Sequence, residues 1–523
     1  MLRFIRWTTL ASLSFSLLLA PPAQADEPRA ALVALEEELN TLKEAQENND
    51  LLIRKLKERV EAQTKTLEQQ AATMADLRKR LQEGDAVKVQ IQALEARLAE
   101  LGDGAANRAS AGALQLGFKA DIRVRPEISN NRTDFDGDTE DSDGFWSHRV
   151  RLGAELGIED WVRAKVLVQD ARRFGEVTTT GDGVAIHEGW AELRPPWAQG
   201  FSLRAGRTEL AFGRERLVGT DDFGDTGQAF DGGFLRYELP PYIQLDLFYA
   251  KIRESQGLEG DGDFFGLYVS TEGVPYCTFD AYYFGLVDEV NGIERTDQGD
   301  RDVSSKHNIH TLGLRGELLF KGLLLEGEAA FQLGTRTDPV EPAKELDHFA
   351  TAYYAELSYQ IPVLLLPTIG AFFATATGDD NPRDTKSIEF LQLFPTRHAF
   401  LGKMDLFAWS NIMDIGGTFE LTPPRGFGVY AAFHYFRLPQ TSGALPGGFG
   451  AGKTPDPTAE DIDRTALGNH VGYELDLILS WSPNDLFSME GGYSVFLPST
   501  VIENLGGGTD PAHWAYLQLR VQY

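Results

Sequence analysis

Arg149-Val150-Arg151-Leu152-Gly153-Ala154-Glu155-Leu156 is a stretch in which apolar residues occupy every second position, with charged residues and a glycine between them. Residues 162–169 repeat the pattern, with valines and Ala164 on one face and Arg163, Lys165 and Gln169 on the other. Successive side chains of a β-strand point to opposite faces. A period of two therefore predicts strands with one polar and one apolar face. The same alternation recurs at 243–249, 312–318 and 471–480.

This alternation fits a soluble β-sandwich as well as a membrane barrel, and three features favour the barrel. No helical pattern interrupts the strands after residue 113. Long polar connections such as 131–144, 293–306 and 440–467 separate some strands, whereas other turns are short. Aromatic residues stand near strand ends, as they do at the interfaces of membrane barrels. These aromatics are Trp161, Tyr242, Tyr353, Tyr359 and Tyr493.

The sequence thus predicts an all-β, antiparallel transmembrane barrel over residues 113–523. Strands with their turns average about 20–25 residues, so 411 residues (113 to 523) correspond to about 18 strands. A barrel of that size encloses an aqueous lumen.

The C-terminus carries an alternating apolar face that ends in an aromatic residue. Ala515, Leu517, Leu519, Val521 and Tyr523 form this face. Such an ending resembles the recognition signal read by the bacterial barrel-assembly machinery, which makes that machinery an expected partner through Tyr523. Any amphipathic last strand would share part of the pattern.

The N-terminus reads as a secretory signal peptide over residues 1–25. Arg3 and Arg6 precede an uncharged apolar run, and Ala23-Gln24-Ala25 is a small-x-small cleavage site. The apolar run is shorter than the ~20 residues that a membrane-spanning helix needs. We therefore expect secretion to a Gram-negative cell outer membrane.

A coiled coil is predicted over residues 26–101. Apolar residues recur at alternating three- and four-residue spacing from Leu32 to Leu81, and the pattern resumes after Gly84 with a shift of three residues. The expected role is a periplasmic stalk that joins copies of the chain, for example as a trimer. A single helix packed elsewhere or folded back at Gly84 is the alternative. Residues 102–112 are a Gly/Ala/Asn/Ser linker.

Composition and motifs exclude several classes of protein. The formal charge of −29 argues against a general basic surface for nucleic acid. The single cysteine, Cys277, excludes an intrachain disulfide framework. No GxSxG, HExxH, P-loop or dinucleotide fingerprint is present, so we expect neither an enzyme nor a cofactor. The acidic run 134–143 does not match an EF-hand, so no metal site is expected and an extracellular loop near lipopolysaccharide is favoured.

Two stretches resemble the alginate export family of outer-membrane barrels. The first runs from Leu203-Arg204-Ala205-Gly206-Arg207 through Arg216-Leu217-Val218-Gly219 to Phe230-Asp231-Gly232. The second includes Gly378-Asp379-Asp380-Asn381-Pro382, Leu393-Phe394-Pro395-Thr396-Arg397-His398, Gly402-Lys403-Met404-Asp405-Leu406-Phe407 and Trp409-Ser410-Asn411. The resemblance covers about 113–523 and not the coiled coil, which resembles that of some trimeric anion-selective porins. It implies a channel that passes an anionic polysaccharide such as alginate through an arginine-lined pore.

Strand parity predicts which basic residues face the lumen. If the apolar faces meet lipid, the interleaved residues line the pore, and a ring of Arg and Lys would favour anions and hold carboxylates bidentately. Arg207, Arg397 and Lys403 are added from the two motifs, where an inward loop could recruit them. The predicted substrate path is Arg149, Arg151, Arg163, Lys165, Arg204, Arg207, Arg236, Arg315, Arg397, Lys403 and Arg520.

Acids such as Glu317 and Glu326 share the lumen face, so for any single arginine structural pairing is favoured over substrate contact. Three functions remain open: passive export or diffusion of an anionic polysaccharide, a trimeric porin for small anionic solutes, and a structural tether between the outer membrane and the cell wall. Outer-membrane lipid and lipopolysaccharide are partners in each case.

Overall fold

The structure is a computed structural model. It describes residues 114–159, 161–174, 184–239, 242–253, 261–271, 274–290, 293–296, 299–302, 305–338, 344–381, 384–441 and 468–523. The predicted signal peptide, coiled coil and linker lie outside the described residues and remain predictions. Among the described residues, no helix has the length and hydropathy needed to cross a membrane.

Eighteen long strands form the main sheet. The first nine are β1 (Leu114–Asn130), β2 (Asp143–Ile158), β3 (Val162–Arg173), β4 (Ala185–Leu193), β5 (Phe201–Thr208), β6 (Phe230–Leu239), β7 (Ile243–Arg253), β8 (Gly262–Ser270) and β9 (Cys277–Val290). The second nine are β12 (Ser305–Phe320), β13 (Leu323–Thr337), β14 (Glu345–Gln360), β15 (Thr368–Ala376), β17 (Ile412–Leu421), β18 (Phe427–Arg437), β19 (His470–Asn484), β20 (Phe487–Pro498) and β21 (Ala512–Gln522).

Three short strands and two short helices accompany the barrel among the described residues. The short β16 (Lys386–Ser387) pairs in parallel with the start of β14. Strands β10 (Ile293–Thr296) and β11 (Gly299–Asp302) form a separate hairpin. The described helices are a 3-10 turn, η1 (Arg397–Ala399), and a five-residue helix, α4 (Thr500–Asn504).

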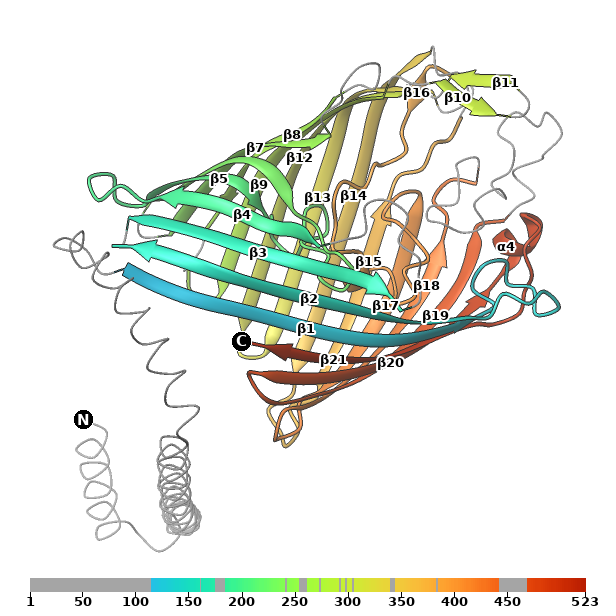
Figure 1. The fold of residues 1–523 in the computed structure, drawn as a ribbon. Helices are drawn as coiled ribbons and strands as arrows, with labels where there is room; N and C mark the ends of the chain where they lie inside the picture. Colours follow the sequence, from blue (N-terminus) through green and yellow to red (C-terminus); the bar gives the residue numbers. More distant parts are fainter. Residues whose placement is uncertain are drawn as a thin grey trace, which may run out of the picture. The chain divides into compact units, whose positions relative to one another are not determined.

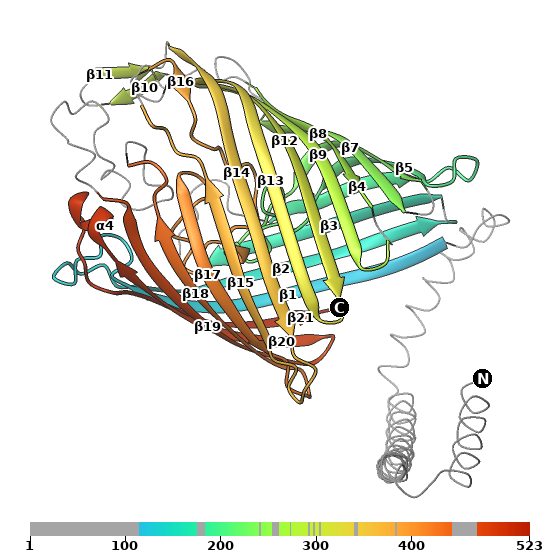
Figure 2. The same ribbon diagram turned by 180° about the vertical axis from the view of Figure 1, so that it is seen from behind.

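The sheet closes on itself. Each long strand pairs antiparallel with its neighbour in the chain, and β1 also pairs with β21, with Asp121 opposite Gln522 and Asn130 opposite His513. Figures 1 and 2 show the first and last strands side by side. Closure leaves no unpaired edge, which a sheet in hydrocarbon requires. The prediction of an 18-strand antiparallel barrel is confirmed.

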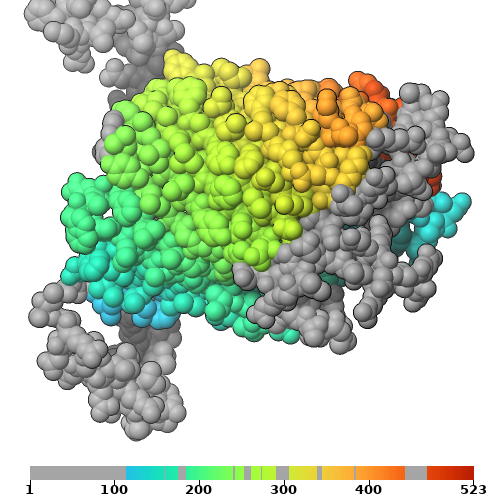
Figure 3. All heavy atoms as spheres, turned by 90° about the horizontal axis from the view of Figure 1, so that it is seen from above, coloured from blue at the N-terminus to red at the C-terminus, as the bar shows by residue number. Residues whose placement is uncertain are grey.

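Burial in this barrel is the reverse of that in a soluble protein. Leu152, Leu314 and Leu357 point outward with 55%, 63% and 53% of their surface exposed, whereas Arg149 and Glu326 point inward and are only 1% and 2% exposed. An apolar exterior and a polar interior are the properties of a membrane barrel. Figure 3 shows one side of this wall, over which the colours run in sequence order from green through yellow to orange. The five aromatics predicted near strand ends are all exposed. Trp161, Tyr242 and Tyr359 do stand at or next to strand ends, but the prediction was wrong for Tyr353 and Tyr493, which lie in the middle of β14 and β20.

The two ends of the barrel differ in their connections. At one end the turns are short, such as 159–161, 321–322 and 485–486; at the other, the connections include 131–142, 209–229, 377–411 and 438–469. We refer to them as the short-turn end and the long-loop end. Two of the long connections turn into the barrel: the first inward loop (209–229) and the second inward loop (377–411).

The outward position of Leu152, near the middle of β2, gives a test of the membrane barrel. Replacing Leu152 by Arg should lower the free energy of unfolding by about 2–4 kcal/mol, the cost of a cation on the lipid face near the bilayer midplane. Denaturant titration of the protein folded into lipid vesicles measures this cost. Leu152→Met is the matched control and should change stability by less than about 1.5 kcal/mol. Equal stability of the Arg and Met variants would contradict a lipid-facing Leu152.

Candidate functional site

The two inward loops join each other inside the barrel. Val218 of the first loop forms a parallel bridge with Phe394 of the second. The Gly219 N–H donates to the Phe394 carbonyl at 2.8 Å, and the Phe394 N–H donates to the Leu217 carbonyl at 2.8 Å. Loop segments 175 residues apart therefore share backbone hydrogen bonds (394 minus 219) and form one unit across the lumen.

Side chains reinforce this junction. The Thr396 hydroxyl donates to the Glu215 carboxylate, and the Asp221 N–H donates to the same hydroxyl oxygen at 3.0 Å. Arg397 lies 3.2 Å from the Asp221 carboxylate, while 70% of its side chain stays exposed. The "GRERLVG" and "LFPTRH" motifs are thus the two halves of a single junction.

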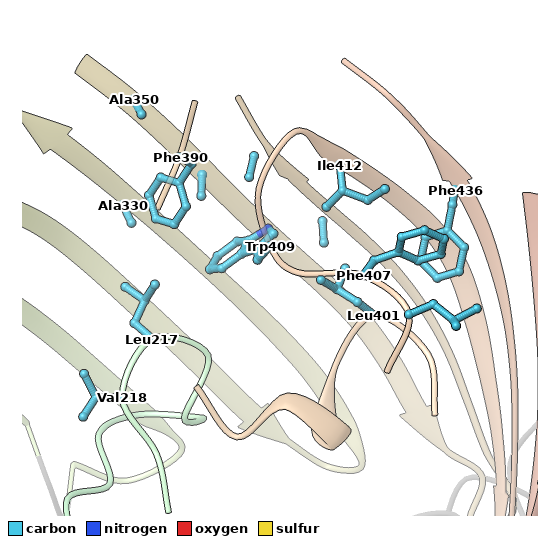
Figure 4. Close-up of a cluster of buried hydrophobic side chains, with 14 of the residues drawn as sticks. Leu217, Val218, Ala330, Ala350, Phe390, Leu401, Phe407, Trp409, Ile412 and Phe436 are labelled. Atoms are coloured by element: carbon cyan, nitrogen blue, oxygen red, sulfur yellow. The ribbon is translucent and has the colours of Figure 1, made fainter. Parts of the chain in front are cut away.

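Apolar packing fixes the joined loops against the wall. Leu217 from the first loop and Phe390 from the second are buried and lie near the small side chains Ala330 and Ala350 of β13 and β14, as Figure 4 shows. Phe407 packs on Phe436 of β18, with ring centroids 4.7 Å apart. Small residues on the wall leave room for the aromatic side chains of the loops.

An arginine cluster on β1, β2, β3 and β21 holds the tip of the first inward loop. The Asp222 carboxylate lies 2.7 Å from Arg149, 3.3 Å from Arg151 and 2.7 Å from Arg520. Arg123 donates to the carbonyls of residues 222 and 224 at 2.6 and 2.8 Å. We call Arg123, Arg125, Arg149, Arg151, Arg173 and Arg520 the arginine wall.

These arginines keep Asp222 ionised. Burial alone would raise the pKa of its carboxyl, but the charges of Arg149, Arg520 and Arg151 lower the pKa to about 2. Charge-assisted hydrogen bonds of this kind are about twice as strong as neutral ones. The loop tip is therefore anchored to the wall at neutral and mildly acidic pH.

The second inward loop is anchored beside the arginine wall, by Glu474 of β19, which is separated from β21 by β20 alone in the sheet. Its Oε1 accepts the N–H groups of Lys403 and Met404 at 2.7 and 2.8 Å. Gly402 makes this approach possible, since its φ is +85° and an added Cβ would lie 2.5 Å from the Glu474 carboxylate. Any larger residue there would push the carboxylate away from the two amides.

Most of the predicted lumen cations are paired. Arg204 contacts Glu192 at 2.6 Å, Arg236 contacts Asp246 at 2.6 Å, and Arg315 contacts Asp280 at 2.7 Å. Lys165 pairs with Glu188, and the Lys403 ammonium donates to the His398 carbonyl at 2.9 Å. These contacts agree with the structural alternative that single arginines pair with neighbouring acids.

Arg163 differs from the other lumen cations. It lies opposite Glu192 in the register of β3 and β4, but Glu192 is already contacted by Arg194 and Arg204. Arg163 has no ion pair within 4 Å among the residues described.

Arg207 departs from the expectation that it lines the substrate path. Successive side chains of β5 point to opposite faces of the sheet, and Arg204 points into the lumen. Arg207, three residues later, therefore points outward, as does Leu203, which is 41% exposed on the outer wall. Its partner is Asp231, its neighbour on β6. Position in a motif did not reveal the side chain's face, whereas strand parity from Arg204 would have placed it outside.

The alternation of side chains along a strand would also have predicted two further lumen arginines in β1. Arg123 and Arg125 alternate with Ile122 and Val124 in β1 and could have been assigned to the lumen in the same way. Asp222 could not, because nothing local to residues 209–229 shows that this loop turns inward. In the described part of the chain no grouping of three or more His, Cys, Asp or Glu side chains could hold a metal ion.

Asp222 gives a test of the anchor. Asp222→Ala leaves Arg149, Arg151 and Arg520 without their shared carboxylate, so chloride should pass more readily relative to potassium. A unit charge about 4 Å from an ion changes its energy by about 1 kcal/mol in water, so we expect a rise in the permeability ratio of about fivefold. Reversal potentials under a KCl gradient measure it. Asp231→Asn, which unpairs Arg207 on the outer face, is the control, and an equal shift in both variants would refute the anchor.

Comparison with known proteins agrees with this geometry. No curated protein sequence matches the chain. Among solved structures, OccK2 (OpdF) of Pseudomonas aeruginosa in complex with glucuronate has 12% identity and a TM-score of 0.51, with 78% of this chain and 98% of that one covered. OccK9 (OpdG) of the same organism has 10% identity and a TM-score of 0.51, with 78% and 99% covered. These likenesses show a shared barrel fold.

The family comparison is more specific. The family model described as "Alginate export" matches residues 114–515, which span the barrel and both inward loops. The resemblance seen in the two motifs is confirmed, and the fold and family are those of an outer-membrane channel rather than an enzyme. The chain belongs to the alginate export family of outer-membrane β-barrels.

Proposed function

We propose that this channel passes anionic saccharides passively, as export or diffusion, along the arginine wall. The proposal rests on the net charge of the arginine wall when the carboxylates of the first inward loop are left out of the count. Its six arginines contact two carboxylates that belong to strands, Asp121 and Glu127. The others belong to the first inward loop: Glu209, Asp222 and Asp225. Among the described residues, the arginine wall and the strand carboxylates in contact with it therefore carry an excess of four positive charges (6 minus 2).

The loop carboxylates therefore occupy positions that a solute carboxylate could take. Asp222 accepts hydrogen bonds from Arg149 and Arg520 at 2.7 Å each, the kind of contact that guanidinium groups make with carboxylates in general. A uronate moving past the loop tip would exchange contacts with Asp222 at little net cost. Such exchange allows selectivity without trapping the solute, which conduction requires.

An anionic polysaccharide such as alginate is the substrate that membership of the family supports. A second candidate, small anionic solutes, is favoured by the two joined inward loops, because they narrow the lumen. Glucuronate, the ligand in the OpdF complex, is a suitable small probe. Channels of this type have short periplasmic turns and long extracellular loops, so we assign the short-turn end to the periplasm.

Several expected partners remain predictions. The periplasmic stalk, a trimer built on it and a tether to the cell wall all depend on residues outside the described range. Lipopolysaccharide would surround the long-loop end, and Tyr523 would be read by the barrel-assembly machinery. Deleting residues 26–101 would separate the tether from the channel: detachment of the envelope with unchanged permeability would make tethering the main role.

Two cations test the anion path because neither of them anchors the arginine wall to the loop tip. Arg163→Gln and Arg397→Gln should each lower the chloride-to-potassium permeability ratio, by up to about fivefold for the loss of one nearby charge. Reversal potential in planar bilayers measures the ratio, and block by added polyuronate should weaken in the same variants.

Arg207→Gln is the matched control. It removes the same charge from the outer face of the barrel and should leave both selectivity and block unchanged. Cation-selective current in the unaltered protein, or equal effects of all three substitutions, would overturn the anion path. Anion current that polyuronate does not block would favour the small-solute alternative, and absence of current would favour the tether.

A further inference from the structure

A cavity of about 520 Å³ lies on the side of the lumen across from the arginine wall. It is bounded by β12–β18 and by both inward loops, and it extends to residues at the short-turn end of the barrel, including Gly322, Gln360 and Thr368. Its volume is in the range typical of small-molecule sites. None of the arginine-wall residues lines it.

The cavity is acidic. Four carboxylates line it: Glu326, Glu356, Asp414 and Glu420. Two of them have cationic partners, since Glu326 contacts Arg216 at 2.7 Å and Asp414 contacts His434 at 2.8 Å. Glu356 accepts the Tyr354 hydroxyl at 2.8 Å. Neither Glu356 nor Glu420 has an ion pair within 4 Å among the described residues. Arg214 also lines the cavity, but it lies 3.2 Å from Glu317 and 3.5 Å from Glu326. A solute carboxylate next to Glu356 and Glu420 would therefore meet repulsion.

Aromatic side chains give the cavity flat apolar surfaces. Phe372 of β15 lies across Gly416 of β17, where an added Cβ would be 2.2 Å from the phenylalanine Cζ. Tyr430 and Phe400 also line the cavity. Tyr354 is less available, because the Arg216 guanidinium stacks 3.4 Å from its ring centre. The ring of Phe372 depends on the glycine beneath it for this position.

One buried hydrogen-bond donor at the cavity has no acceptor. Trp409 lines the cavity and is only 3% exposed, and its indole Nε1–H has no partner among the described residues. Its backbone N–H, by contrast, donates to Gln392 at 3.1 Å. An unsatisfied buried donor costs about 1–3 kcal/mol, so a ligand oxygen that reached the indole N–H would be stabilised.

We propose that this cavity binds a neutral saccharide ring. The C–H face of a pyranose would stack on Phe372 or Tyr430, its hydroxyls would donate to Glu356 and Glu420, and a ring or hydroxyl oxygen would accept from the Trp409 indole. Glu356 and Glu420 would accept the hydroxyls of a neutral sugar, and the same two carboxylates would repel the carboxylate of a uronate. The inference rests on the proposed channel function for the solute's route, and it adds a second class of solute to that of the arginine wall.

Calorimetric titration of the full-length protein in detergent, with cellobiose and with glucuronate, tests the site without requiring conduction. Cellobiose should bind, and glucuronate should bind this cavity at least fivefold more weakly. Trp409→Phe keeps an aromatic ring but removes the N–H, and it should weaken cellobiose binding about fivefold. Glu420→Gln should retain cellobiose binding and reduce the discrimination against glucuronate.

Trp514→Phe is the matched control, because the Trp514 N–H already donates to Glu127 at 3.1 Å on the arginine-wall side. It should leave cellobiose binding unchanged. Heat-modifiable gel mobility shows whether each variant is folded, and Tyr430→Ala supplies a second test if Trp409→Phe does not fold. No cellobiose binding, or equal loss in the Trp409 and Trp514 variants, would overturn the site.

Different results would refute the anion path and the saccharide site. Cellobiose binding together with a channel that lacks anion preference would leave the saccharide site standing and refute the anion path. Anion preference without cellobiose binding would do the reverse. Glucuronate displaced by cellobiose in the unaltered protein would also overturn the site, because it would show that one cavity takes both sugars.

Discussion

Pairing of β1 with β21 is the constraint on which the rest of the structure depends. In hydrocarbon an unpaired backbone N–H or C=O costs several kcal/mol, so a sheet of this size is stable in a membrane only when its first and last strands meet. The Asp121–Arg520 pair crosses this seam, with two contacts of 2.8 Å. Closure encloses a lumen, and the charged side chains that point into this lumen are partly removed from water.

Closure also explains why the interior is rich in ion pairs. Alternate residues of every strand point inward, and the apolar ones are needed outside against lipid. Charged side chains inside are partly or wholly removed from water, and a buried charge without a partner is costly. The first inward loop supplies the carboxylates that the arginine wall lacks. The loop is thus part of the charge balance of the wall and also narrows the passage.

The two sides of the lumen consequently have different chemistry. The arginine wall carries excess positive charge that the first inward loop offsets. The opposite side holds Glu356 and Glu420 beside aromatic rings and an indole N–H that has no partner among the described residues. A solute that crosses between the inward loops and the wall meets both. This separation of charge across the lumen would suit the two proposed classes of solute, anionic saccharides and neutral sugars.

Much of this protein could be predicted from the sequence because alternation is a local property of a strand. The 18 strands, the apolar exterior and the inward position of Arg149, Arg151 and Arg204 follow from residues one and two apart, and the two motifs sufficed for the family. The same parity, applied consistently, would have added Arg123 and removed Arg207. Local sequence thus determined which face each strand residue takes.

Only the tertiary structure decided what those residues meet. Asp222 is 298 positions from Arg520, and Val218 is 176 positions from Phe394 (394 minus 218), so neither contact leaves a pattern in neighbouring residues. Whether a long connection extends into solvent or turns into the lumen depends on the free space and charge that the closed barrel offers. The sequence therefore determined the barrel and its polar lining, and the fold of the loops within that lining decided which charges remain open to a solute.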